Sequence, residues 1–138
     1  MAFNENSRVK IPALIHLGKL GFQYLSLKDQ TWDRDTNIFT EIFETSLKKL
    51  NPKSQPEDLQ NFRQKIIGFL DNDDLGKVFY ENLISQNGLK IIDFEDFSNN
   101  SFHCVTELEF QKGLDAFRPD ITILINGLPL VFIEVKKP

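Results

Sequence analysis

Three residues near the C-terminal end of the sequence have the side chains needed to cut a phosphodiester bond. Asp120 is followed after thirteen residues by Glu134, and Lys136 lies two positions further on. Two neighbouring carboxylates repel each other unless a cation binds between them, and Mg2+ prefers a few carboxylates together with water and phosphate oxygens. A lysine beside the ion can orient the attacking water and balance the charge that develops on the phosphate. The spacing alone is a weak signal, because a hairpin with solvated charged ends would contain the same residues.

The hairpin that carries these residues decides whether they meet. Two apolar runs, 121–125 and 130–135, flank a turn sequence at 126–129, which predicts two antiparallel strands. A regular two-residue turn would send Asp120 and Glu134 to opposite faces of the sheet. We therefore predict a three-residue loop, or a bulge with the same effect, so that both carboxylates and the lysine share one face.

The chain divides into a helical half, about 8–88, and a strand-rich catalytic half, about 89–138, which contains the hairpin. Ser54 and Glu57 resemble a capping box, and Asn87-Gly88 resembles a C-terminal helix cap. Apolar residues at helical spacing predict four helices, the first of them buried, over residues 12–20, 37–50, 56–70 and 75–84. Shorter apolar or alternating runs predict strands over residues 22–25, 89–92 and 101–110.

Composition places the chain among globular proteins of one domain. It has 138 residues, of which 41% are hydrophobic and 26% charged, and a net charge of -4. This charge excludes a protein that coats nucleic acid over its whole surface, so any DNA contact must be local. One cysteine excludes an internal disulfide. The sequence has no apolar run long enough for a membrane span and no signal peptide at its start, which predicts a cytoplasmic protein without a membrane partner.

Three stretches of the sequence resemble one protein family. The segment from Phe117 to Pro138 joins Arg118-Pro119-Asp120 to Glu134-Val135-Lys136 through a turn of the sequence Asn-Gly-Leu-Pro-Leu. It resembles the nuclease motif of the restriction (R) subunit of type I restriction-modification enzymes, and the segments 93–107 and 8–27 also resemble parts of that subunit. The resemblance implies the PD-(D/E)xK nuclease fold, a mixed β-sheet flanked by helices, and Mg2+-dependent cutting of double-stranded DNA.

The same resemblance implies roles for individual residues. Asp120 and Glu134 match the carboxylates that bind the metal ion, the backbone carbonyl of Val135 is a further ligand, and Lys136 matches the catalytic lysine. Relatives often place another acidic residue on the first helix, where this sequence has Val9-Lys10-Ile11-Pro12 and no carboxylate. Glu41 or Glu44 could substitute for it, although both are better explained as solvated helix residues. The basic side chains that could bind DNA phosphates are Arg118 and Lys137.

The family also implies what surrounds this chain. R subunits continue into further nuclease elements and two ATP-driven motor domains, whereas this sequence has no phosphate-binding loop motif. We therefore expect residues 1–138 to be the N-terminal part of a nuclease domain, with ATP bound only by motor domains that lie outside it. The implied partners are double-stranded DNA and the methyltransferase and specificity subunits of a restriction complex. The alternative is a docking module with a truncated or inactive nuclease fold that binds DNA or subunits without cutting.

Other residues that could bind ligands have simpler explanations. His16 lies in an apolar helix, where a packed side chain is more common than a ligand. His103 is expected to point outward beside two glutamates and could lie near the site. One histidine with two acidic residues at strand spacing is only weak evidence for a metal site. Cys104 has the position of a core residue, and Trp32 that of a half-buried loop residue rather than a base-stacking one. The acidic run at 71–74 is typical of a helix cap.

Overall fold

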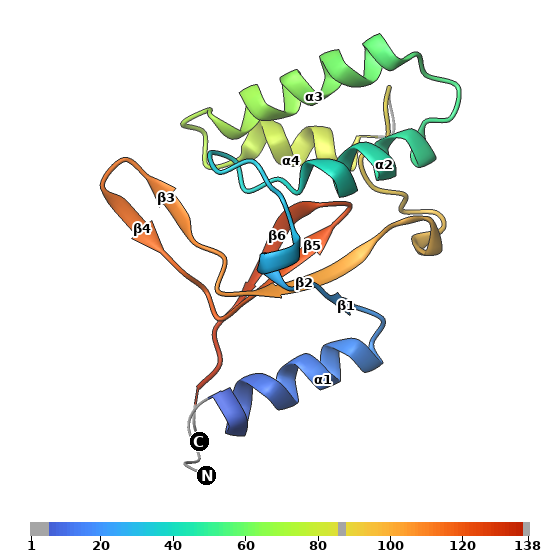
Figure 1. Cartoon of the computed structure of the whole chain (residues 1–138). Coiled ribbons are helices and arrows are strands. Elements are labelled where there is room, and N and C mark those ends of the chain that lie inside the picture. The colour runs from blue at the N-terminus through green and yellow to red at the C-terminus, as the bar shows by residue number, and fades with distance from the viewer. Residues whose placement is uncertain (1–5, 86–87, 137–138) are drawn as a thin grey trace.

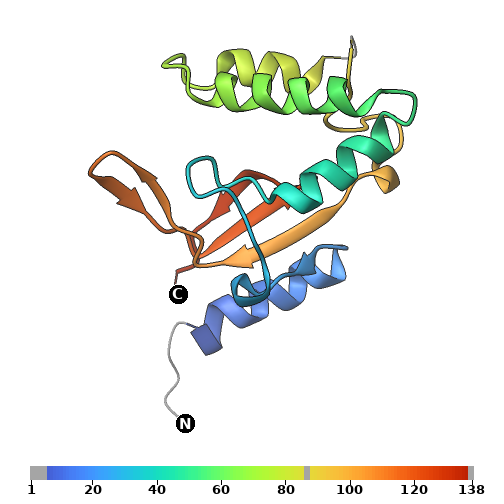
Figure 2. The same cartoon turned by 45° about the horizontal axis from the view of Figure 1, so that its top comes forward.

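A four-stranded mixed sheet has helices on both of its faces (Figure 1, Figure 2). The computed structural model describes residues 6–85 and 88–136. Strand β1 is parallel to β2, and the other neighbours in the sheet order β1-β2-β5-β6 are antiparallel. A separate hairpin of β3 and β4 projects from the body of the molecule (Figure 1). The strands are β1 (Gln23–Tyr24), β2 (Phe102–Thr106), β3 (Phe110–Lys112), β4 (Asp115–Phe117), β5 (Ile121–Ile125) and β6 (Leu128–Ile133). The predicted mixed α/β class is confirmed.

Helix α1 (Ile11–Lys19) covers one face of the sheet and follows a π-helical turn (Asn6–Lys10). Leu17 is buried in a cluster with Cys104 and Ile121, so burial of this inner stripe holds the helix against β2 and β5. The helix is present where the sequence predicts it, but the expectation that it is buried is wrong for its outer face. His16 is exposed there and is not the packed residue that we expected.

The opposite face is covered by α2 (Thr40–Leu50), with α3 (Pro56–Leu70) and α4 (Lys77–Ile84) packed outside it (Figure 2). The apolar stripe of α2 buries Phe43 and Leu47 in the same cluster as Leu128 of β6. The predicted capping box is wrong: the N-cap of α3 is Gln55, because Pro56 begins the helix one residue later than a cap at Ser54 requires.

The N-cap of α4 is Gly76 rather than a residue of the acidic run, so the predicted cap is wrong in position, although the start of the helix is bound by Asp74. Its carboxylate accepts hydrogen bonds from the backbone N–H groups of Gly76, at 3.1 Å, and Val78, at 3.0 Å, at the start of α4. Asn87, half of the predicted C-terminal cap, lies outside the described residues. Cys104 is buried and Trp32 is half-buried, with its ring stacked on Phe39 at 5.5 Å between centroids, as predicted for both.

The predicted strand over 89–92 is absent, because side-chain amides bind its backbone in place of a neighbouring strand. Asn51 accepts a hydrogen bond from the N–H of Lys90 and donates one to its carbonyl, both at 2.8 Å. Asn126 donates to the carbonyl of Ile91 at 2.8 Å. The backbone of Lys90 and the carbonyl of Ile91 therefore have hydrogen-bond partners, while Ile91 and Ile92 remain buried.

The predicted strand over 101–110 is divided into two. Strand β2 ends at Thr106, and Glu107 adopts a left-handed backbone conformation with φ 60. This turn breaks the alternation that the sequence pattern assumed, and the chain continues into β3, which starts at Phe110. The β3–β4 hairpin was not predicted, although Gly113, with φ 62, is the type of residue that such a tight turn favours.

Candidate functional site

A bulge in the β5–β6 hairpin brings the two predicted carboxylates opposite each other. The turn has two residues, since Ile125 pairs with Leu128, and Leu130 is an extra residue between the pairs Leu124–Pro129 and Ile123–Val131. Ile121 consequently pairs with Ile133, and the next residues in the same register are Asp120 and Glu134. The three-residue loop is wrong, and the alternative prediction of a bulge is confirmed.

The site lies at the end of the sheet, just outside the strands. Strand β6 ends at Ile133 rather than at Val135, so Glu134 and Lys136 follow the strand and their side chains are not positioned by strand alternation. Asp120 precedes β5 and follows the buried residue Pro119. Strand ends leave backbone and side chains open to solvent, so this position suits a site that must admit a large substrate.

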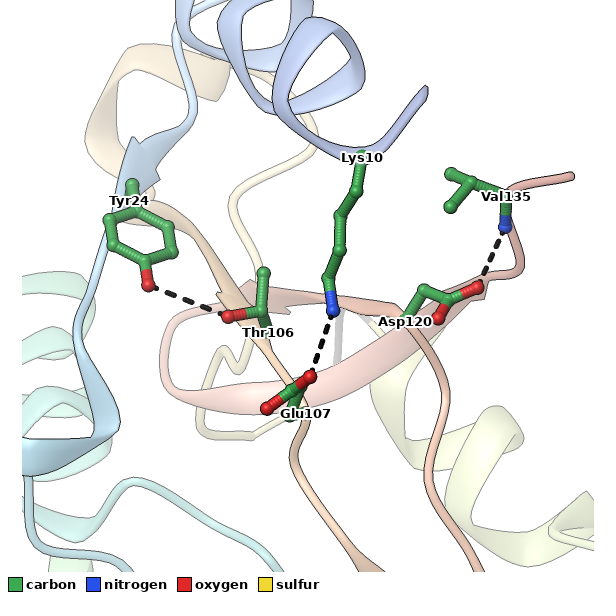
Figure 3. Close-up of polar contacts among 6 residues, drawn as sticks. All are labelled: Lys10, Tyr24, Thr106, Glu107, Asp120 and Val135. Atoms are coloured by element: carbon green, nitrogen blue, oxygen red, sulfur yellow. Dashed lines mark hydrogen bonds and ion pairs between the residues drawn. The ribbon is translucent and has the colours of Figure 1, made fainter. Parts of the chain in front are cut away.

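Asp120 and Glu134 act on each other electrostatically. The backbone N–H of Val135 donates to Asp120 Oδ2 at 2.9 Å, and this hydrogen bond is the main reason why the pKa of Asp120 lies below its ordinary value (Figure 3). The pKa of Glu134 is raised, mainly by its side-chain interaction with Asp120. The positive charge of Lys136 lowers the pKa of both groups. The predicted residues therefore form one interacting group in which Asp120 is the more acidic partner.

Two further residues join this group that the sequence did not assign to it. Lys10, in the turn before α1, pairs with Glu107 at 3.3 Å between Nζ and Oε1 (Figure 3). The N–H of Glu107 is 3.4 Å from the carbonyl oxygen of Asp120, so the end of β2 lies directly beside the start of β5. The sequence pattern placed Glu107 in a predicted strand. No local pattern could predict its pairing with a lysine 97 positions away.

Other predicted site residues lie elsewhere or carry no described contact. Glu44 of α2 forms an ion pair with Arg63 of α3, at 2.6 Å, on the face of the sheet opposite α1. Glu41 lies exposed on α2. His103 pairs with Leu124 in the middle of the sheet, and its half-buried ring has its pKa lowered by burial. Arg118 is exposed next to Pro119, and Lys137 lies outside the described residues.

Comparison with known proteins identifies the family of this chain. The family model of the type I restriction enzyme R protein N terminus matches residues 2–138. The chain belongs to this family. It is 32% identical over 160 residues to the type I restriction enzyme HindI endonuclease subunit of Haemophilus influenzae, an alignment that covers 98% of this chain and 15% of that subunit. A Methanocaldococcus jannaschii protein assigned as the MjaIXP type I restriction endonuclease subunit is also 32% identical, over 161 residues, with the same coverage of both chains.

A third relative extends the family to another bacterium. The SauMSSORF170P type I restriction endonuclease subunit of Staphylococcus aureus is 26% identical over 153 residues, covering 99% of this chain and 15% of the subunit. This R-protein N-terminal region thus spans about 15% of the length of these relatives. Within the part of the chain that the structure describes, none of the helices is both long and apolar enough to cross a membrane.

The donor set of the R-protein N-terminal region fits Mg2+. No group of three or more acidic, histidine or cysteine side chains is arranged to hold a metal ion among the described residues. Two carboxylates do lie together, however, and the pKa of Glu134 is raised mainly by its side-chain hydrogen bond with Asp120 and further by burial and by the Asp120 charge. Mg2+ commonly binds through one or two carboxylates and fills its other positions with water and phosphate oxygens.

Proposed function

We propose that this chain is the nuclease portion of a type I restriction R subunit, of the PD-(D/E)xK superfamily, and cuts double-stranded DNA in a Mg2+-dependent reaction. The observation that carries the proposal is the bulge at Leu130, which puts Asp120 opposite Glu134 beside Lys136. Family membership supports the same conclusion, because the relatives are named endonuclease subunits.

In the proposed reaction Asp120, Glu134 and the backbone carbonyl of Val135 would hold the ion. A bound Mg2+ would polarise the scissile phosphate and acidify a water molecule. Lys136 orients that water for attack on phosphorus and balances the negative charge that forms on the phosphate oxygens. The bond from phosphorus to the 3′ oxygen breaks, so the products carry a 5′-phosphate and a 3′-hydroxyl. Arg118 and Lys137 would contact neighbouring phosphates.

The proposal also includes subunits and domains that lie outside this chain. Methyltransferase and specificity subunits would choose the DNA, and ATP would be used by motor domains outside these residues, in the cytoplasm. The alternative function, docking of DNA or subunits without cleavage, uses the same fold and is separated from the proposal by experiment.

Plasmid cleavage with Mg2+ and ATP tests the proposal in the assembled restriction complex that carries this chain. Asp120→Ala, Glu134→Gln and Lys136→Met should each lower the cleavage rate by about 100-fold or more, while DNA binding measured by filter retention stays intact. Asp115→Ala, which removes an exposed carboxylate from the β3–β4 hairpin, is the matched control and should cut normally. Equal cleavage by wild type and Asp120→Ala would reject the catalytic assignment, and no cleavage by either would favour docking.

A further inference from the structure

Lys10 is unusual because it is a charged side chain in a buried position. Its side chain is 10% exposed, and among the described residues it is the single lysine, arginine, aspartate or glutamate in the buried class. The π-helical turn that holds it leads directly into α1, where Leu17 packs against Cys104 and Ile121. Burying an ammonium group is costly unless it is paired, so this position requires a partner.

The partner of Lys10 is Glu107, and Glu107 is tied to the proposed site by its backbone. The Nζ of Lys10 lies 3.3 Å from Glu107 Oε1, and the Glu107 side chain is otherwise 55% exposed. The left-handed conformation of Glu107 and its N–H contact with the carbonyl of Asp120 place the two residues side by side. Figure 3 shows the ammonium group of Lys10 between Glu107 and Asp120, and its charge contributes to the lowered pKa of Asp120.

Three acidic residues therefore lie in a row across the sheet end. Each of them is the residue directly before or after one of three neighbouring strands. Glu107 follows β2, Asp120 precedes β5 and Glu134 follows β6. Opposite residues of adjacent antiparallel strands have Cα atoms about 5 Å apart, so Glu107 and Glu134 both neighbour Asp120, although the three described side chains are not grouped around one ion position. In the structure only two of them face each other freely, because Lys10 holds the third.

We propose that Lys10 is a positioning residue that binds Glu107, keeps it from coordinating the metal ion, and so leaves the ion to Asp120 and Glu134. This inference rests on the proposed function, because it concerns the same metal site. Lys10 and Glu107 together add no net charge beside the ion. A metal ion held by fewer carboxylates keeps more positions for water and for the phosphate of the substrate, which the cleavage reaction needs.

Binding of Mn2+ to this chain, measured by titration calorimetry without DNA, tests the inference independently of activity. Lys10→Met keeps the apolar stem and removes the charge, which frees Glu107 to coordinate. We expect Mn2+ to bind about tenfold more tightly to this variant than to wild type. Lys10→Arg keeps the positive charge and should bind Mn2+ as wild type does. Unchanged affinity in Lys10→Met would overturn the inference.

The double variant Lys10→Met, Glu107→Gln identifies the carboxylate involved. It lacks both members of the ion pair and has the same net charge as wild type at this position, so the affinity for Mn2+ should return to within about threefold of wild type. Affinity as tight as that of Lys10→Met would show that Glu107 is not the added ligand and would overturn the inference.

Two single variants cover the case in which Lys10→Met does not fold, which thermal unfolding in EDTA detects. Glu107→Gln leaves Lys10 unneutralised beside Asp120 and should weaken Mn2+ binding several-fold, whereas Glu109→Gln removes an exposed carboxylate two residues away and should change it little. Equal affinities of these two variants would overturn the inference. Asp120→Ala tests the proposed function separately: Mn2+ binding that does not depend on Asp120 would reject the metal site itself, whatever the role of Lys10.

Discussion

At the scale of single residues, the environment gives neighbouring groups of one type different properties. Asp120 and Glu134 are both carboxylates at the sheet end, yet the N–H of Val135 lowers the pKa of Asp120, whereas the side-chain hydrogen bond with Asp120 is the main reason why the pKa of Glu134 is raised. Histidines differ in the same way. His16 is exposed on α1, and the ring of His103 lies half-buried in the sheet with a buried Nδ1 that has no hydrogen-bond partner in the described residues.

The lowered pKa of His103 predicts a pH dependence of stability. Its ordinary value is 6.5, and burial lowers it in the folded protein, so the unfolded chain binds the proton more readily. The contribution of His103 to the free energy of unfolding is therefore fully present above about pH 6.5 and is lost as the pH falls through the lowered value. Urea unfolding should show that the free energy of unfolding differs less between pH 7.5 and pH 5.5 in His103→Gln than in wild type.

The exposed histidine provides the control for this measurement. His16→Gln changes the same residue type without burial and should retain the wild-type difference between the two pH values. An equal reduction in both histidine variants would contradict the role of burial at His103.

At the scale of elements, the β5–β6 hairpin sets the register on which the site depends. Both ends of the hairpin are held by contacts outside it. At the turn, the buried amide of Asn126 accepts from the N–H of Ser101 and donates to Asn100 Oδ1, and the N–H of Phe39 donates to the carbonyl of Gly127. At the other end, Val135 binds Asp120. The bulge at Leu130 adjusts the register between these two fixed points.

Changes in strand length test this register. Deleting Leu130 removes the bulge but leaves Asp120 opposite Glu134, so Mn2+ affinity should stay within about threefold of wild type, with a loss of about 1–3 kcal/mol in stability from the missing side chain. Inserting one alanine after Leu130 moves Ile133 opposite Asp120 and should weaken Mn2+ binding by about tenfold or more. Calorimetry on both variants makes the comparison, and wild-type affinity after the insertion would contradict the register account.

The turn itself requires glycine at position 127. A Cβ atom there would lie 2.7 Å from the carbonyl oxygen of Phe39 and 2.8 Å from the backbone nitrogen of Phe43, and the residue has φ +80. Gly127→Ala should therefore lower the free energy of unfolding by about 2–4 kcal/mol, measured by urea denaturation. Gly68→Ala in α3, where nothing lies within 4 Å, is the matched control and should raise stability by about 0.5–1 kcal/mol. A similar effect of both substitutions would contradict the close packing of the turn.

The elements predictable from sequence were those with a local signal. Helical spacing identified α1 to α4, and the parity of the hairpin predicted that Asp120 and Glu134 share a face through either a three-residue loop or a bulge, of which the structure has the bulge. The missing strand at 89–92 could not be foreseen, since the amides that bind its backbone come from Asn51 and Asn126, far away in the sequence. The pairing of Lys10 with Glu107 escaped prediction for the same reason.

At the scale of the whole molecule, the two layers of helices leave one end of the sheet for chemistry. Helix α1 covers one face and α2 to α4 the other, and the β3–β4 hairpin leaves the sheet between Glu107 and Asp120 (Figure 1). Phe132 of β6 packs edge-on against Phe110 and Phe117 of that hairpin, at 4.7 Å and 5.4 Å between ring centroids, which connects the hairpin to the sheet. The net charge of -4 is compatible with DNA cleavage on this account, because acidic groups at the sheet end are placed to hold a cation.

The position of a bound metal ion tests the central claim most directly. Crystals of this chain soaked in Mn2+ and measured at a wavelength with strong manganese anomalous scattering would locate the ion without reference to activity. We predict one anomalous peak about 2–2.5 Å from carboxylate oxygens of Asp120 and Glu134, with Glu107 still bound to Lys10. An anomalous peak away from Asp120 and Glu134, or none in a chain shown by calorimetry to bind Mn2+, would contradict it.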